Sequence, residues 1–281
     1  MSMGTTVSVC SLPIGGIAGS AAIFPDVLQR AANVLKEAEG TLLTDSFVTH
    51  VADRLVLMMV HEQCASSPMI TAIKNAAVAA AGETARKRRL FCRAAEQVLC
   101  GLSFAERESE PFVLFLADAE SDSFWNQILL SQFADPFATP SIADGRGFVF
   151  CTEDAAMFQT PQDLHRVITA TKTSAIVGVA EDADTPAASA GAGAVMIARA
   201  EYPYPATAEL CGVFARPRIS PDGVLCPVSL CDGRRVSHGI VPVVALGFSV
   251  AEGKISGPVD LFDNPAFDAA RDAAGKLSGF L

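Results

Sequence analysis

The sequence predicts a mixed α/β (α+β) fold in which helices cover β-sheets, and three observations lead to this prediction. The chain has 281 residues and is 50% hydrophobic, which is enough material for a sizeable core. Short runs rich in β-branched and aromatic residues are bounded by turn residues, as strands are. Amphipathic stretches lie between these runs without strict β-α-β alternation, which is typical of a layered domain. We expect residues 1–281 to form one domain.

The expected strands are apolar runs that end at Gly, Pro, Asn, Asp or Ser. They cover residues 6–12, 47–60, 112–118, 147–152, 174–180, 194–202, 225–230 and 240–250. The segment between 181 and 194, with the sequence "EDADTPAASAGAGA", is rich in turn residues and low in complexity. We expect it to be a flexible loop rather than a domain boundary.

The expected helices have apolar residues at helical spacing next to a start signal. Residues 25–39 begin with a proline and carry an apolar stripe, as amphipathic helices do. Residues 160–171 open with a Thr cap, and residues 264–277 open with an Asn cap followed by Pro. The remaining expected helices cover residues 68–81 and 83–101.

The charge and composition exclude several classes of partner. The formal net charge of −10 argues against binding to nucleic acid or to an anionic membrane surface, which both need Lys and Arg. No apolar run is long enough to span a membrane, and no basic residue precedes Arg30, unlike a signal peptide. The eight cysteines include no CxxC pair, so we expect reduced, buried thiols in a cytoplasmic protein.

The stretch "VTHVADRLVLMMVHE", residues 48–62, puts several ionisable side chains on one expected strand. Asp53 and Arg54 are adjacent in an apolar run, and buried charges need partners. On a continuous strand His50 lies on the face opposite Asp53, which favours a structural role. His61 shares the face of Asp53 but lies roughly 26 Å away at strand rise, so we do not expect the two in one site.

A glycine-rich turn, "GGIAGS" at residues 15–20, follows the first expected strand and precedes a helix. Backbone N–H groups in such a turn can bind a phosphate. The spacing matches neither the P-loop nor the dinucleotide-binding pattern, so on this basis alone a structural tight turn is the favoured interpretation.

Long stretches resemble one family in order along nearly the whole chain. They are "SVCSLPIGGIAG", "FPDVL", "THVADRL", "ERESEPFVLFLAD", "FADPFATP", "RPRISPDGVLCPVS" and "LGFSVAEGKISGPVDLFDNPAFDAAR". They resemble the archaeal-type (class V) fructose-1,6-bisphosphate aldolase/phosphatases. The resemblance implies a four-layer α-β-β-α sandwich and a homo-oligomer, with a shortened segment around 181–194 and no family tail after about residue 280.

The resemblance also implies chemistry that this chain has altered. The family holds magnesium with carboxylates and a His, and it forms a Schiff base on a Lys. At the corresponding positions this chain has Pro13, Ser20, Arg54 and Ala119, and Gly191, Ala192 and Gly193 replace a Lys-Asp-Asp run. Asp53 and Asp118 match acidic family positions, and Gln97 matches a family Gln. Arg54 could pair with Asp53 in place of a divalent ion, so we expect no metal ligand.

Three functional interpretations remain from the sequence. The favoured one is a repurposed, metal-independent and cofactor-free enzyme, an acid–base isomerase, cyclase or lyase, acting on a small and less anionic molecule. Asp53 and Asp118 would be catalytic, and Arg54, Gln97, Gly16 and Ser20 would bind the substrate. The second is a non-catalytic pseudoenzyme or binding protein. The third, residual sugar-bisphosphate phosphatase or aldolase activity, is the weakest because it needs both metals and a Schiff-base Lys.

Overall fold

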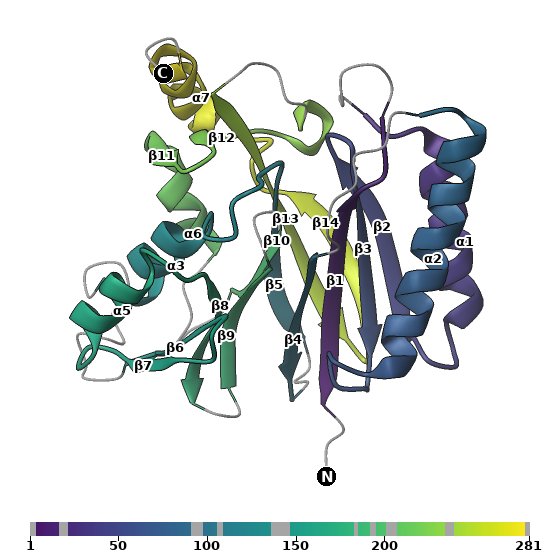
Figure 1. Cartoon of the computed structure of the whole chain (residues 1–281), viewed down its shortest axis with the longest axis horizontal. Coiled ribbons are helices and arrows are strands. Elements are labelled where there is room, and N and C mark those ends of the chain that lie inside the picture. The colour runs from purple at the N-terminus through teal and green to yellow at the C-terminus, as the bar shows by residue number, and fades with distance from the viewer. Residues whose placement is uncertain are drawn as a thin grey trace.

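The computed structural model describes residues 4–16, 22–90, 98–105, 109–135, 147–182, 185–191, 195–200, 207–233 and 239–278. Two β-sheets pack face to face, and helices cover the outer face of each sheet (Figure 1). The fold is therefore the mixed α+β arrangement that the sequence predicts, in the four layers, α-β-β-α, that the family resemblance implies.

The small sheet has four antiparallel strands in the order β2-β3-β1-β4. Their bounds are β1 Thr5–Pro13, β2 Asp45–Val51, β3 Arg54–His61 and β4 Val98–Phe104. Helices α1 (Pro25–Ala38) and α2 (Pro68–Lys87) cover its outer face. Each helix begins with a proline at its first position, where the missing N–H costs nothing.

The large sheet has ten strands in the order β11-β12-β13-β5-β10-β9-β8-β6-β7, with β14 beside β13. Their bounds are β5 Glu110–Ala117, β6 Val149–Thr152, β7 Met157–Gln159, β8 Ile176–Asp182, β9 Thr185–Gly191, β10 Val195–Arg199, β11 Arg218–Ser220, β12 Gly223–Pro227, β13 Ile240–Ala251 and β14 Lys254–Asp260.

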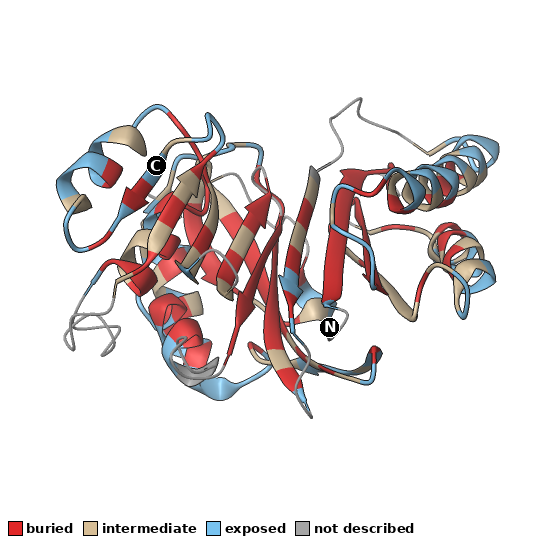
Figure 2. Ribbon diagram, turned by 90° about the horizontal axis from the view of Figure 1, so that it is seen from below, coloured by how far each residue is buried: buried red, intermediate tan, exposed pale blue. Residues whose placement is uncertain are grey.

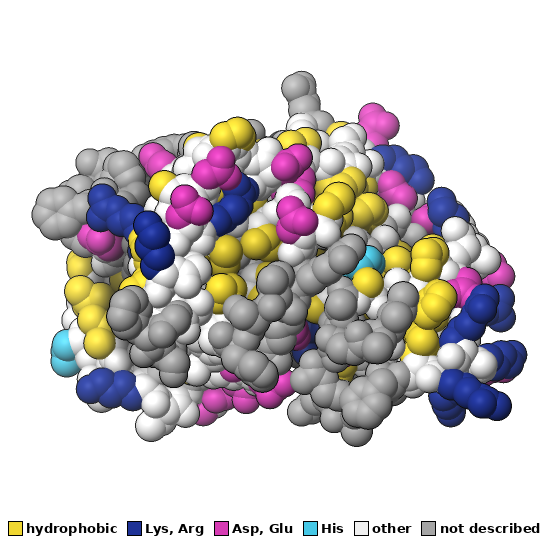
Figure 3. Space-filling view, turned by 90° about the horizontal axis from the view of Figure 1, so that it is seen from above, with side chains coloured by type: hydrophobic (Ala, Val, Ile, Leu, Met, Phe, Trp, Pro, Cys, Tyr) yellow, Lys and Arg dark blue, Asp and Glu magenta, His cyan; other side chains and the backbone are white. Residues whose placement is uncertain are grey.

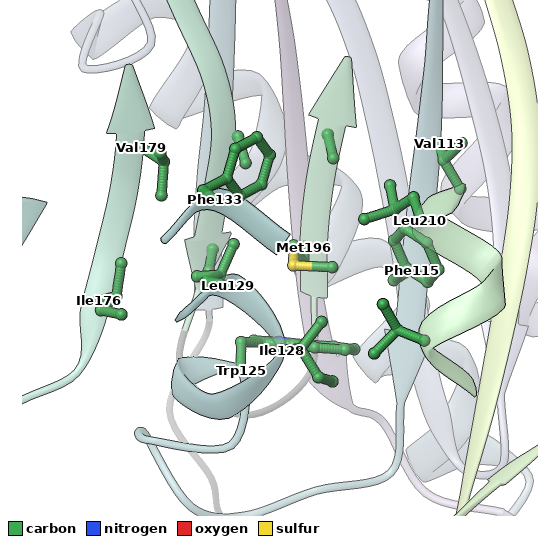
Figure 4. Close-up of a cluster of buried hydrophobic side chains, with 14 of the residues drawn as sticks. Val113, Phe115, Trp125, Ile128, Leu129, Phe133, Ile176, Val179, Met196 and Leu210 are labelled. Atoms are coloured by element: carbon green, nitrogen blue, oxygen red, sulfur yellow. The ribbon is translucent and has the colours of Figure 1, made fainter. Parts of the chain in front are cut away.

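Helices and short 3-10 turns accompany the large sheet. They are α3 Asn126–Phe133, α5 Leu164–Ala170, α6 Thr207–Gly212, η1 Val213–Ala215, η2 Leu230–Asp232, η3 Pro265–Phe267 and α7 Asp268–Ser278. On its outer face, Trp125 and the α3 residues Ile128, Leu129 and Phe133 pack over strand residues that include Phe115 and Met196 (Figure 4). This cluster forms the largest apolar core.

A second apolar core fills the space between the two sheets. It joins Val9 and Met58 of the small sheet to Leu114, Leu116 and Val244 of the large sheet. All residues of β1 and β3 are buried, because one face meets this core and the other meets α1 and α2. Figure 2 shows that buried residues concentrate along the strands of both sheets, whereas many residues of α1 and α2 on the outside of the small sheet are exposed. Strands covered on both faces read as continuous apolar runs.

The expected long strand over 47–60 is wrong, because the chain turns back on itself there. Val51 pairs with Arg54, so Ala52 and Asp53 form a two-residue turn between β2 and β3. Ala52 has a φ of 50°, which side chains other than glycine's rarely adopt. The alternation of faces assumed for a continuous strand therefore does not pass through Asp53.

Two other sequence-based expectations are also corrected. The expected helix over 83–101 is wrong, because α2 continues unbroken to Lys87 and residues 98–104 form strand β4. The expected loop over 181–194 contains β9, which lies between β10 and β8 in the large sheet. Alanine and serine hide this strand in the sequence, because they lack the β-branched and aromatic character that marks most strands.

The helix caps agree with the sequence only in part. Asn264 accepts a hydrogen bond from the Ala266 N–H at 2.9 Å, so the expected Asn cap is confirmed at η3, which leads into α7. Thr160 does not cap a helix, because its hydroxyl donates to the Phe148 carbonyl at 3.0 Å and α5 begins at Leu164.

The described cysteines are free thiols, but they are not all buried as expected. Cys64 and Cys231 are exposed and Cys151 is half-buried, whereas the remaining described cysteines are buried: Cys10, Cys100, Cys211 and Cys226. Within the described residues, no helix is both long enough and apolar enough to cross a membrane.

Candidate functional site

Asp53 lies in the tight turn that joins β2 to β3 and is fully buried. Backbone hydrogen bonds fix this turn on two sides. The Ile14 N–H donates to the Asp53 carbonyl at 3.0 Å, and the Ala52 N–H donates to the Gly233 carbonyl at 2.8 Å. The turn is therefore held between the end of β1 and the segment that follows η2.

Arg54 is the first residue of β3 and lies opposite Pro13 of β1. It alternates in step with Val56 and Met58, which belong to the core between the sheets, so its side chain lies on the face toward the large sheet. Its Nε donates to the Ser11 hydroxyl at 3.2 Å, and the residue is 8% exposed. The guanidinium is thus anchored inside the sandwich rather than in solvent.

Asp118 directly follows β5 and is 1% exposed. The loop that continues from it is held by Asp222, in the turn between β11 and β12. The carboxylate of Asp222 accepts from the Ser121 N–H at 3.2 Å and more weakly from the Glu120 N–H at 3.4 Å. A distant hairpin therefore fixes the backbone next to Asp118.

Asp53 and Asp118 come from facing sheets and lie at the same end of the sandwich. A Cβ built at Gly233, which binds the Asp53 turn, would lie 3.2 Å from Val244 Cγ2. Val244 in turn pairs with Leu116, two residues before Asp118. Figure 3 looks onto this end of the molecule, where apolar side chains show between charged ones. The structure thus places Asp53, Arg54 and Asp118 at the same end of the sandwich.

The other predicted substrate-binding residues are placed less fully. Ser20 and Gln97 lie outside the described residues. Gly16 is buried at the same end of the sandwich, three residues beyond the last residue of β1. Its neighbour Gly15 has a φ of 96°, a conformation that needs glycine. The backbone conformation therefore explains why the glycine-rich turn has a glycine at position 15.

The residues at this end were tested against the magnesium site that the resemblance implies. Within the described ranges, no group of three or more His, Cys, Asp or Glu side chains could hold a metal ion. Pro13, Arg54 and Ala119 offer no anionic oxygen, and hard cations such as Mg²⁺ need several oxygen ligands. The described donor set does not fit a cage for several magnesium ions.

Sequence reasoning missed two residues around the site, Gly233 and Asp222, and it placed a third, His50, without the turn that follows it. The His50 Nδ1 lies 3.2 Å from the Ala52 carbonyl, so His50 belongs to the hairpin that carries Asp53. The expected placement of His50 opposite Asp53 assumed a continuous strand, and the Ala52–Asp53 turn removes that assumption; within β2, His50 alternates with Val51 and lies on the face toward α1 and α2. The link between His50 and Asp53 can be predicted only if the Ala52–Asp53 turn is recognised first. An Ala-Asp pair does not reveal such a turn, because it lacks the glycine or asparagine that usually marks one.

His61 lies at the far end of β3 from Asp53, so the expectation that the two do not share a site holds. Its Nε2 lies 2.9 Å from the Ser8 hydroxyl, and its Nδ1 lies 3.0 Å from the Gln63 carbonyl. Burial lowers the pKa of His61, and the backbone hydrogen bond to Gln63 opposes this in part. This histidine belongs to the interface between the small sheet and its helices.

Comparison with known proteins agrees with the fold. Residues 4–281 match the family model described as "Fructose-1,6-bisphosphatase". A protein of Ignicoccus hospitalis is 32% identical, over all of this chain and 85% of its own length. Proteins of Sulfurisphaera tokodaii, at 31% identity over 99% of this chain and 86% of theirs, and Methanocaldococcus jannaschii, at 26% over 98% and 84%, are also similar. All three carry the name fructose-1,6-bisphosphate aldolase/phosphatase. Since the match spans both sheets and their covering helices, the chain belongs to the fructose-1,6-bisphosphatase family of this aldolase/phosphatase type.

Proposed function

We propose that the chain is an enzyme that acts on a small molecule at the end of the sandwich where Asp53 and Asp118 lie. One observation carries this proposal: two buried carboxylates from facing sheets share this end with a buried arginine. Burying such groups is costly. Such groups are rarely buried without a reason, and buried acids of this kind are typical of functional sites.

In this proposal the two carboxyl groups divide the proton chemistry. One donates a proton to the reacting group and the other accepts one, as an isomerase, cyclase or lyase requires. Arg54 supplies a fixed positive charge in place of a metal ion and orients a polar group of the substrate. Val51, Leu116 and Val244 form the apolar core next to this end, and apolar surroundings of this kind favour a substrate less anionic and more apolar than a sugar bisphosphate.

The test uses the nearly isosteric variants Asp53→Asn and Asp118→Asn. Small molecules that raise the melting temperature of the wild type are first collected from a screen, and their turnover is followed by mass spectrometry. Each variant should lower turnover by about 10²–10⁴-fold, the usual contribution of an acid or base, with an unchanged circular dichroism spectrum. Full turnover in both variants would show that the chemistry lies elsewhere.

Residual sugar-bisphosphate phosphatase or aldolase activity is a second candidate, and family membership favours it. The relatives that carry this name match 98–100% of the chain. Phosphate release from fructose 1,6-bisphosphate and condensation of triose phosphates should be assayed with Mg²⁺ and with EDTA. Release that needs Mg²⁺ and is lost in Asp118→Asn would support this candidate and overturn the metal-independent one.

The remaining alternative is a non-catalytic binding protein, for which ligands would bind without turnover. For each candidate we propose a small-molecule partner, a cytoplasmic location and a homo-oligomer. The resemblance supports the oligomer, and the free thiols among the described cysteines support a reducing compartment. A monomeric mass in solution scattering would contradict the oligomer.

A further inference from the structure

A hollow lies beside the edge of the small sheet, away from the candidate site. Within the described chain, β4 is the last strand of the small sheet, and the large sheet extends past it with β8, β6 and β7 (Figure 1). The resulting cavity measures about 310 Å³ and is lined by residues of β4, β6, β7, β8 and β9. Pockets for small molecules usually measure about 300–1,000 Å³.

Gly178 of β8 lines this cavity next to irregularities in the pairing of β8, and its φ does not itself require glycine. Its φ lies outside the left-handed region, and an added Cβ would meet only the Ala188 carbonyl oxygen, at 3.8 Å. By contrast, a Cβ at Gly101 across the cavity would lie 2.7 Å from Ala65 Cβ, so packing explains that glycine. A glycine inside a strand weakens it, and such glycines often mark the close approach of a ligand or another backbone.

The lining selects for an uncharged and mostly apolar molecule. Val149, Cys151 and Met157 contribute apolar or weakly polar surface, and Met157 is 68% exposed. The Ser189 hydroxyl, which donates to the Val177 carbonyl at 3.5 Å, adds a polar group. Among the described residues of the lining, Asp182 alone is charged, so it would repel an anionic ligand.

The cavity is separate from the candidate site. Its residue Ser189 pairs with Ile197, and Ile197 pairs with Leu114 of β5. Leu114 lies four positions before Asp118 in the sequence. By strand spacing and rise, Ser189 at the edge of the cavity is roughly 16 Å from Asp118.

We infer that this cavity, bounded by β4 and by strands β6 to β9, is a second binding site that takes a small uncharged apolar molecule. The inference does not depend on the reaction proposed for Asp53 and Asp118. It rests on the volume of the cavity, on its apolar lining and on Gly178 within that lining.

The test fills the cavity with a side chain that the backbone tolerates. 1-Naphthol, an uncharged apolar probe, is titrated into the protein and followed by saturation-transfer NMR. Gly178→Val should weaken its binding by about tenfold or more. The control Ser256→Val also introduces a strand valine, at an exposed position of β14, and should leave binding unchanged, as should Asp118→Asn.

The charge of the probe gives a second measurement. 1-Naphthoate has the same rings with a carboxylate, and it should bind about tenfold more weakly than 1-naphthol or worse. Equal binding of 1-naphthol to wild type and Gly178→Val, or binding that does not saturate, would overturn the inference. A wild-type oligomer that dissociates in Gly178→Val would also overturn it, because the cavity would then hold a protein neighbour.

Discussion

His61 is a buried histidine whose two ring nitrogens are both engaged. Because the Gln63 carbonyl only accepts, Nδ1 must carry the hydrogen, and Nε2 of the neutral ring accepts from the Ser8 hydroxyl. Burial, the larger effect, lowers the pKa of His61 below its ordinary value of 6.5, and the Gln63 hydrogen bond acts against it. The unfolded chain therefore binds a proton at a pH where the folded protein does not.

This difference predicts acid sensitivity. Above the unfolded-state pKa of 6.5, His61 is neutral in both states and the folded protein keeps its full stability. As the pH falls below that value, the unfolded chain binds more protons than the folded protein, so the free energy of unfolding decreases. Urea unfolding between about pH 7.5 and pH 5.5 should show a falling free energy of unfolding, and His61→Gln should reduce the slope. The exposed His165→Gln is the control and should keep the slope. An unchanged slope in His61→Gln would contradict the assignment.

The β2–β3 hairpin is the element for which the prediction from the sequence fails most clearly. Nine uninterrupted residues of β1 and eight of β3 are buried, so their apolar runs predict strands correctly. The turn residues Ala52 and Asp53 look no different from strand residues in an apolar run, and tertiary contacts with Ile14 and Gly233 hold them in place. The local sequence could therefore predict that Asp53 is buried. It could not predict the turn that fixes the position of Asp53.

Ala52→Gly tests this turn directly. At a φ of 50° alanine is strained and glycine is not, so the substitution should raise the free energy of unfolding by up to about 1 kcal/mol. Ala38→Gly is the matched control: it makes the same substitution in a helix, at the end of α1, and should not stabilise. A loss of stability in Ala52→Gly, measured by urea unfolding, would argue against the turn.

The loop after Asp118 depends on an element that is distant in sequence. Asp222 accepts hydrogen bonds from the Ser121 and Glu120 N–H groups. No local pattern in the sequence predicts these hydrogen bonds. Asp222→Ala should speed hydrogen exchange at the Ser121 amide by about tenfold, since one or two net hydrogen bonds are lost. Asp272→Ala removes the same charge from exposed α7 and should leave that amide unchanged. Unaltered exchange in Asp222→Ala would show that other contacts hold the loop.

On the scale of the whole molecule, a family fold persists although the described part of its expected metal site has changed. Relatives match 98–100% of the chain, and the four layers rest on apolar cores that need no ion. The long family-like stretches could thus predict the fold. They could not predict the chemistry, because Pro13, Arg54 and Ala119 change the donor set without disturbing the strands that carry them.

This separation of fold and metal site predicts that magnesium does not stabilise the protein. A ligand that binds only the native state at a hundred times its dissociation constant adds about 2.7 kcal/mol, or roughly 5–10 °C in melting temperature for a chain of this size. The wild type should show no such shift between EDTA and millimolar Mg²⁺. Arg54→Asp puts a second buried carboxylate beside Asp53, where repulsion should lower stability in EDTA and Mg²⁺ should restore part of it. A large Mg²⁺ stabilisation of the wild type would show that the native protein holds a specific magnesium site, and the metal-independent proposal would then fail.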